Sequence, residues 1–198
     1  MLTVSKDTRL YKFIEYIEPA VGKADYWTWR GGIIPDGPGA YAFNGPVPDI
    51  QLVIREGLFC AAVPTLALRC NGKRVPFRPG FPDPRYDGGI AAYFTGTLGA
   101  GYFSAYDVPF DLARAKQWAT TTRSGVLLGK GYYGPTLALQ GHAAILLPSG
   151  YVLQSSLLPG LNWDSHIDQE RPYWANGGTM THPDNWLEYA GDQAPWAQ

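Results

Sequence analysis

Two shortages in the sequence, of charge and of cysteine, exclude several classes of protein. Charged residues make up 17% of the 198 residues, and the formal net charge is −1. With so little net charge, the chain has no basic surface to hold the phosphates of a nucleic acid or an anionic membrane. We therefore expect no nucleic acid partner.

Cysteine is limited to Cys60 and Cys70. No C-x-x-C pair is present, which excludes a zinc ribbon and a redox dithiol. A spacing of ten residues in one predicted helix separates the two thiols by about 15 Å along the axis. A disulfide needs Cα atoms within roughly 7 Å of each other. We expect two free thiols in a protein made in a reducing compartment, with no cofactor or metal.

Long hydrophobic segments are also missing. The N-terminal residues contain no apolar stretch of the kind that marks a signal peptide. No run of about 18 apolar residues is present to form a membrane-spanning helix. We expect a protein that is made without a signal peptide and that does not insert into a membrane.

Glycine, proline and aromatic residues, by contrast, are abundant. The chain has 24 Gly and 17 Pro, and 45% of its residues are hydrophobic. This composition favours a loop-rich α+β domain over a helical bundle, and the length suits one domain. We predict a single monomeric domain over residues 1–198, with a core over about 5–165 and a C-terminal extension over 166–198.

The hydrophobic pattern places helices before strands along the chain, which is typical of α+β folds. Helices are predicted over residues 5–18, 60–70 and 109–119. Strands are predicted over residues 124–129, 142–147 and 151–155, with a further strand near Trp174 or near residues 186–189. Residues 148–150 join two of the strands as a hairpin. We expect the N-terminal helices to pack on a small antiparallel sheet.

Cys60 is the first candidate for chemistry, because it opens the predicted helix over residues 60–70. The unpaired N–H groups and the positive dipole end at a helix start favour the nucleophilic thiolate. The alternative is a structural thiol, since free cysteines are usually buried. Cys70 lies near the other end of the helix, where the dipole opposes thiolate formation, and is predicted to be structural.

His142 is the candidate base. It begins the predicted strand 142–147, so its side chain can point into a cleft while the next residues fill the core. The alternative is an ordinary core or surface histidine. A catalytic histidine needs an orienting group, and two residues compete for this role. Gln154 lies on the other strand of the hairpin, whereas Asp164 offers a carboxylate that would also stabilise an imidazolium.

The spacing of these residues leads to a known family. Glycine and proline follow the cysteine by twelve and sixteen residues, and glycine and glutamine follow the histidine by eight and twelve: Cys60, Gly72, Pro76, His142, Gly150 and Gln154. In this spacing the chain resembles the NlpC-type cell-wall peptidases, a circularly permuted branch of the papain-like fold.

Two further segments are similar to elements of that family. Tyr26-Trp27-Thr28-Trp29-Arg30-Gly31-Gly32 looks like a Tyr-x-Trp-Gly-Gly element, and Gly125-Val126-Leu127 is the counterpart of a Gly-Asp-Leu element. The chain departs from the family at the cysteine itself. It reads Phe59-Cys60-Ala61-Ala62 where the family usually has Asp-Cys-Ser-Gly.

Trp163-Asp164-Ser165 resembles a Trp-acidic-Ser element in the N-terminal peptidase domains of mycobacteriophage lysins. The resemblance implies a papain-like fold and a cysteine peptidase or amidase that hydrolyses amide bonds in peptidoglycan stem peptides. It further implies a phage endolysin or its catalytic domain, made in the host cytoplasm and acting on the cell wall after release. Of the two orienting groups we slightly favour Asp164, because a carboxylate does more for an imidazolium than an amide, although the hairpin favours Gln154.

Three other functions stay open. A zinc-dependent amidase would take ligands from His142, His166 and Asp168 or His182, although no H-E-x-x-H spacing is present. A glycoside hydrolase would use two of the 17 acidic residues. A non-catalytic phage structural or cell-wall-binding module would use the aromatic residues as a platform.

Overall fold

The computed structural model describes residues 9–26, 46–58, 60, 62–73, 107–133 and 139–188. Its helices are α1 (Tyr11–Ile17), the 3-10 helix η1 (Glu18–Ala20), α2 (Ile50–Glu56), α3 (Ala62–Cys70), α6 (Leu112–Thr122), α7 (Ile167–Ala175) and α8 (Pro183–Trp186). Its strands are β1 (Asp107–Pro109), β2 (Val126–Tyr133), β3 (Leu139–Leu146), β4 (Val152–Ser156), β5 (Gly160–Asn162) and β6 (Gly178–Thr181).

The six strands form one antiparallel sheet in the order β1-β6-β2-β3-β4-β5. In the hairpin, Ile145 of β3 pairs with Leu153 of β4. Gly150 in the turn has a φ of 86°, and a Cβ there would meet the His166 ring at 2.3 Å. Only glycine fits this position without strain. The predicted hairpin and the α+β class are both confirmed.

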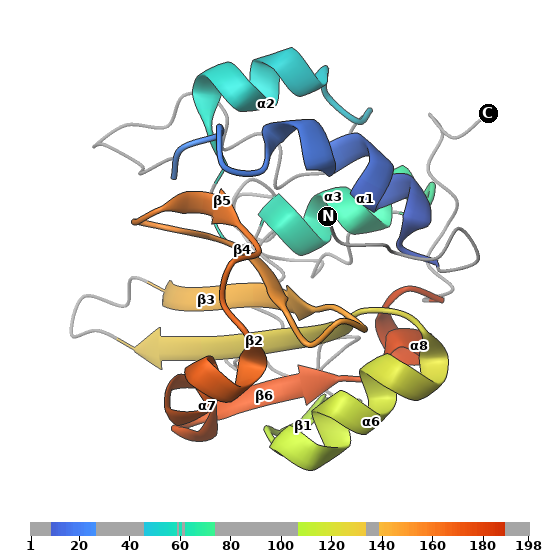
Figure 1. The fold of residues 1–198 in the computed structure, drawn as a ribbon, viewed down its shortest axis with the longest axis vertical. Helices are drawn as coiled ribbons and strands as arrows, with labels where there is room; N and C mark the ends of the chain where they lie inside the picture. The colour runs from blue at the N-terminus through green and yellow to red at the C-terminus, as the bar shows by residue number, and fades with distance from the viewer. Residues whose placement is uncertain are drawn as a thin grey trace, which may run out of the picture.

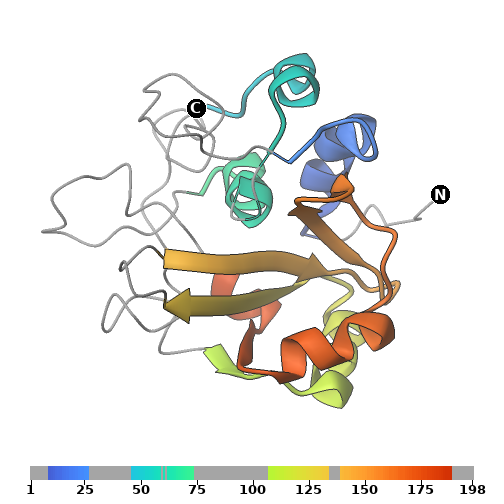
Figure 2. The same ribbon diagram turned by 90° about the vertical axis from the view of Figure 1, so that its left-hand side faces the viewer.

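Helices cover both faces of this sheet. Figure 1 shows α1, α2 and α3 on one side of the strands and α6 and α7 on the other, and the turned view in Figure 2 agrees. Side chains alternate between the two faces along a strand. In β3, Ile145 packs with the helices α1 and α3, whereas Ala144 and Leu146 pack with α6 and α7. The sheet is therefore the middle of three layers.

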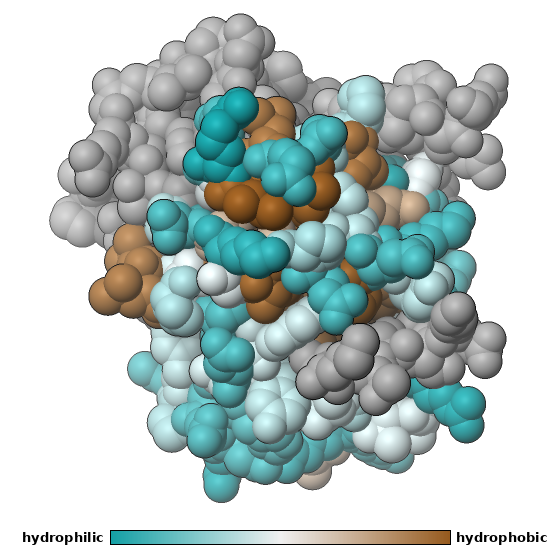
Figure 3. All heavy atoms as spheres, turned by 45° about the horizontal axis from the view of Figure 1, so that its top comes forward, coloured by the Kyte–Doolittle hydropathy of each residue, from teal (hydrophilic) through white to brown (hydrophobic). Residues whose placement is uncertain are grey.

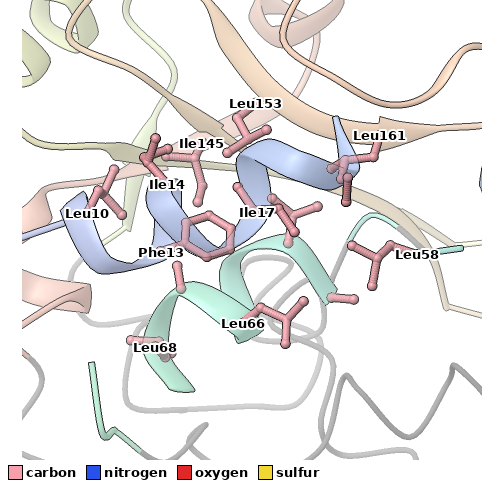
Figure 4. Packing of buried hydrophobic residues seen from close by; sticks show 14 of the residues in the cluster. Leu10, Phe13, Ile14, Ile17, Leu58, Leu66, Leu68, Ile145, Leu153 and Leu161 are labelled. Atoms are coloured by element: carbon pink, nitrogen blue, oxygen red, sulfur yellow. The ribbon is translucent and has the colours of Figure 1, made fainter. Parts of the chain in front are cut away.

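The larger core cluster lies between α1, α3 and the sheet. Figure 4 shows α1 and α3 side by side, with Phe13, Ile17 and Leu66 in the space that they share with Ile145 and Leu153. These five side chains are fully buried, and each contributes roughly 1.5–3 kcal/mol by leaving water. α3 is buried along almost its whole length, as expected for a helix that is apolar on all sides.

The helix boundaries differ from the predicted ones by a few residues. Within the predicted helix 5–18, α1 begins at Tyr11, and residues 5–8 lie outside the described part. The helix predicted from Cys60 begins at Ala62, and Gly72 ends it with the expected positive φ of 68°. α6 starts after Asp111, whose side chain accepts the Arg114 N–H at 2.7 Å and caps the helix.

The predicted division into a core over 5–165 and a C-terminal extension is wrong. β6 pairs with both β1 and β2 inside the sheet. Trp174 of α7 and Trp186 of α8 are both 0% exposed. A further strand was predicted near Trp174 or near residues 186–189. Both tryptophans lie in helices and residue 189 is outside the described part, but the strand β6 begins four residues after Trp174. His166 is the N-cap of α7 and His182 is the N-cap of α8. The aromatic residues of this segment gave no indication of these two helices.

The described surface is mostly hydrophilic when seen from the side of α1 and α2, with separate hydrophobic areas (Figure 3). Among the described residues, the largest exposed fractions of big hydrophobic side chains are those of Leu157 (71%) and Leu158 (90%), between β4 and β5. Within the described ranges, none of the helices combines the length and the hydrophobicity needed to cross a bilayer.

Candidate active site

Cys60 lies in the turn that leads into α3, and hydrogen bonds to β4 and to Asp25 hold the residues just before this turn. Its carbonyl oxygen accepts the Val63 N–H at 3.3 Å. Two residues earlier, the Leu58 carbonyl accepts the Ser155 hydroxyl of β4 at 2.6 Å, and the Leu58 N–H donates to the backbone carbonyl of Asp25 at 3.0 Å. Cys60 itself is 6% exposed. The nucleophile candidate therefore sits at the N-terminal end of a buried helix, beside β4.

His142 of β3 meets this cysteine. Hydrogen bonding to Cys60 and the charge of Cys60 both raise the pKa of His142, and the ring nitrogen Nε2 of His142 lies 2.6 Å from Gln154 Oε1. This leaves Nδ1 as the nitrogen that faces the thiol. The structure thus brings together Cys60, which precedes α3, His142 of β3 and Gln154 of β4.

The hairpin register explains how Gln154 reaches the ring. Ile145 pairs with Leu153. If this register continues by one residue, Gln154 lies opposite Ala144. Gln154 is then the diagonal neighbour of His142 on the same face of the sheet. Diagonal neighbours of this kind are within reach of long side chains. The geometry of the hairpin is therefore sufficient to deliver the contact.

Asp164 does not take this place, and the preference for it over Gln154 is corrected. Asp164 is exposed, and the hydrogen bond found for it among the described residues is made by its backbone N–H, which donates to Asn162 Oδ1 at 3.5 Å. Asp164 lies in the short connection between β5 (Gly160–Asn162) and α7. The oxygen beside His142 belongs to an amide rather than to a carboxylate.

Two residues of α7, Glu170 and Trp174, hold the far side of the Gln154–His142 pair, and the sequence analysis missed both. Glu170 Oε1 accepts the Gln154 amide Nε2–H at 2.5 Å, and Glu170 Oε2 accepts the Trp174 indole N–H at 2.8 Å. The Trp174 ring also stacks on His142, with ring centroids 5.6 Å apart and planes at 27°. The four-residue spacing of Glu170 and Trp174 on one helix face was the available signal.

Tyr26 is a third residue that was not singled out as a site residue, although it begins the Tyr-x-Trp-Gly-Gly-like segment. An isolated parallel bridge pairs Tyr26 with Leu58, which carries its ring next to the turn of Cys60. Burial, followed by the charge and hydrogen bond of Cys60, raises the pKa of Tyr26 to about 12. Its hydroxyl therefore keeps its proton at neutral pH and acts as a hydrogen-bond donor beside the thiol.

The charge balance at His142 favours the protonated ring. Burial is the largest influence and lowers the pKa of His142. The hydrogen bond and the charge of Cys60, the hydrogen bond of Gln154 and the charge of Glu170 outweigh burial, so that the pKa of His142 is raised above its usual value. An imidazolium next to a thiol in turn favours the thiolate.

Cys70 has the opposite environment. Burial raises the pKa of Cys70 to about 12, against the smaller lowering effects of Arg69 and Lys12. The thiol therefore stays protonated at neutral pH. Both cysteines are free, as predicted.

The other two histidines cap helices. His166 Nδ1 accepts the Asp168 N–H at 3.4 Å at the start of α7, and His182 Nδ1 accepts the Asp184 N–H at 3.2 Å at the start of α8. Across the described ranges, no three His, Cys, Asp or Glu side chains are grouped so that they would hold a metal ion.

The site thus contains a thiol in contact with a histidine, and the other ring nitrogen of that histidine is held by a side-chain oxygen. Nucleophile, base and orienting group have this arrangement in thiol hydrolases. Comparison of the chain with protein families, with curated proteins and with solved structures found no match. The function is therefore inferred from the residues and their geometry.

Proposed function

We propose that the protein is a cysteine hydrolase in which Cys60 is the nucleophile, His142 is the base and Gln154 orients the ring. The observation that carries the proposal is the setting of His142 between two groups. Cys60 raises the pKa of the ring by its hydrogen bonding and its charge, and Gln154 Oε1 lies 2.6 Å from His142 Nε2. A cysteine that only fills the core would not require a histidine beside it. Such a histidine would in turn not require an oxygen to orient its ring.

In the proposed reaction the Cys60 thiolate attacks the carbonyl carbon of an amide. A C–S bond forms, and the electron pair of the C=O bond moves to the oxygen. His142, as imidazolium, gives its Nδ1 proton to the amide nitrogen as the C–N bond breaks, which leaves a thioester and a free amine. His142 then takes a proton from water, whose oxygen displaces the thiolate and releases a carboxylic acid.

Two donors are available for the oxyanion. The backbone N–H of Cys60 lies next to the N-terminal end of α3, where the helix dipole adds positive potential. The Tyr26 hydroxyl, which hydrogen bonds to Cys60, is a second donor on the thiol side. Donors that are already in place before the reaction lower its barrier because they need no reorganisation.

The substrate that we propose is an amide bond in a peptidoglycan stem peptide. A helix with cysteine at its start packs on an antiparallel sheet whose later strands carry the histidine and its partner. This order supports a papain-like fold of the NlpC type. Together with the sequence resemblance it supports a phage endolysin or its catalytic domain, which would be made in the host cytoplasm and would reach the wall after release.

Digestion of purified bacterial cell walls tests this proposal. The wild-type protein should release new amino and carboxyl groups from the stem peptides, and a quenched reaction should contain a thioester on Cys60 by mass spectrometry. Cys60→Ser should remove both signals, with Cys70→Ser as the matched control. Activity that survives alkylation of Cys60 but is lost with a chelator would contradict the thiol mechanism and favour a zinc amidase. Wall binding without any cleavage would favour a binding module.

A further inference from the structure

The hydrogen bonds around His142 have a fixed direction, and this direction originates in α7. The indole N–H of Trp174 can only donate, and it donates to Glu170 Oε2 at 2.8 Å. A carboxylate such as that of Glu170 can only accept. The second carboxylate oxygen, Oε1, therefore needs another donor, and the Gln154 side chain supplies one at 2.5 Å.

This requirement decides which way the Gln154 amide points. An amide has a donating nitrogen at one side and an accepting oxygen at the other. With Nε2 turned to Glu170, Oε1 must face His142, as it does at 2.6 Å. A hydrogen on His142 Nε2 then fills that bond. In the neutral ring the lone pair consequently lies on Nδ1, toward Cys60.

We propose that Glu170 is a positioning residue that locks the Gln154 amide and thereby fixes the His142 tautomer in which Nδ1 can accept the proton of Cys60. Its importance for catalysis rests on the proposed cysteine hydrolase function, whereas its effect on the tautomer does not. Glu170 touches neither the thiol nor the attacked carbonyl in this scheme.

The lock matters because glutamine alone does not select a tautomer. A Gln154 amide rotated by 180° would offer its NH₂ group to His142 Nε2. The neutral ring would then carry its hydrogen on Nδ1 and would have no lone pair toward Cys60. Such a ring cannot act as the base for the thiol.

α7 is held firmly enough to serve as the reference point for this lock. At its start, His166 and Gln169 form a capping box. Near its end, the buried Lys130 donates to the Tyr173 carbonyl at 2.7 Å, and its Nζ lies 4.2 Å from the centroid of the Tyr173 ring. A Cβ on Gly178 would meet the Trp174 carbonyl at 2.3 Å, so β6 approaches the helix closely.

Glu170→Gln is the test, because it removes one acceptor and changes the shape least. The new amide has a single oxygen for two donors. If that oxygen keeps the indole N–H, its NH₂ group faces Gln154 and forces the Gln154 amide to turn over. We expect kcat for wall peptide to fall by roughly 100-fold, the loss typical of a misplaced catalytic group, with little change in KM.

The double variant Gln154→Glu with Glu170→Gln should restore the lock. Residue 154 is then the double acceptor, from His142 Nε2–H and from the amide at position 170, whose oxygen accepts the Trp174 N–H. Every donor again has an acceptor. We expect most of the lost kcat to return. Glu18→Gln, at an exposed position on η1, is the matched control and should behave as the wild type.

The tautomer itself is measured by ¹⁵N NMR of histidine-labelled protein in a Cys60→Ala background, where the thiol has no influence. Among the described residues, the other titratable or charged groups around the ring are Glu170, Lys130 and Tyr173, and Tyr26 lies on the side of residue 60. The neutral His142 ring should carry its hydrogen on Nε2, should carry it on Nδ1 after Glu170→Gln, and should return to Nε2 in the double variant. If Glu170→Gln does not fold, the double variant alone decides.

The outcomes separate the two proposals. An unchanged tautomer and an unchanged kcat in Glu170→Gln would overturn the positioning role, even if the wild type cleaves wall peptides through Cys60. A double variant that folds without Nε2–H on His142 would overturn it as well. Conversely, a tautomer that switches as expected, together with a wild-type protein that cleaves no wall peptide, would support the lock and contradict the cysteine hydrolase.

Discussion

Removal of the Gln154 side chain is the most direct test of which residue orients His142. In Gln154→Ala the 2.6 Å contact between Oε1 and Nε2 is lost. A hydrogen bond to a charged group contributes about 1.5–3 kcal/mol. Each 1.36 kcal/mol is a factor of ten in rate. If this contact acts mainly in the transition state, kcat/KM should fall by about 10- to 150-fold.

Asp164→Asn is the opposing variant, because the resemblance to lysins points to that residue. Asp164 is exposed, and exposed substitutions usually change free energies by no more than about 0.5 kcal/mol. We therefore expect kcat/KM to change by about twofold at most. The assay is the initial rate of amine release from purified wall peptide, with circular dichroism to confirm the fold of each variant.

The pH profile adds a second measurement of the same contact. The hydrogen bond of Gln154 is one of the influences that raise the pKa of His142. Without it the imidazolium loses its proton at lower pH, so the alkaline limb of kcat/KM should move to lower pH. A large rate loss in Asp164→Asn together with an unaffected Gln154→Ala would refute the reasoning, and so would an alkaline limb that moves upward in Gln154→Ala.

Three further predictions concern the thiols, the oxyanion and the C-terminal segment. Iodoacetamide at neutral pH should alkylate Cys60 well before Cys70, whose pKa of about 12 keeps its thiol protonated; peptide mapping that finds the reverse order would contradict the assignment. Tyr26→Phe should lower kcat by about 10- to 100-fold, somewhat less than the loss of a full oxyanion donor, in the same wall assay; an unchanged kcat would remove Tyr26 from the mechanism. Trp186→Ala, at a fully buried position whose indole donates to the Gly125 carbonyl at 3.0 Å, should lower the free energy of unfolding by about 3–5 kcal/mol; a urea titration without a shifted midpoint would show that this segment is not part of the core.

Local rules were enough to predict much of the fold. The spacing of apolar residues identified α1 and the hairpin, because side-chain periodicity is a property of each element by itself. The same rules failed for residues 167–186. There the strand β6 has only four residues, and its neighbours β1 and β2 come from earlier parts of the chain. No local pattern announces a strand that is inserted between two distant ones.

The amino-acid sequence by itself determined the candidate nucleophile and base, since Cys60 precedes a helix and His142 lies on an apolar strand. It also offered Gln154 and Asp164 as partners, with the hairpin in favour of Gln154 and the charge in favour of Asp164. Only the tertiary structure decided between them, because the hairpin register puts Gln154 on the face of His142 while Asp164 lies past the end of β5, exposed. The proposed positioning role of Glu170 also depends on the tertiary structure. Its contacts join α7 to β4, and the direction of a hydrogen-bond chain exists only once those elements are packed together.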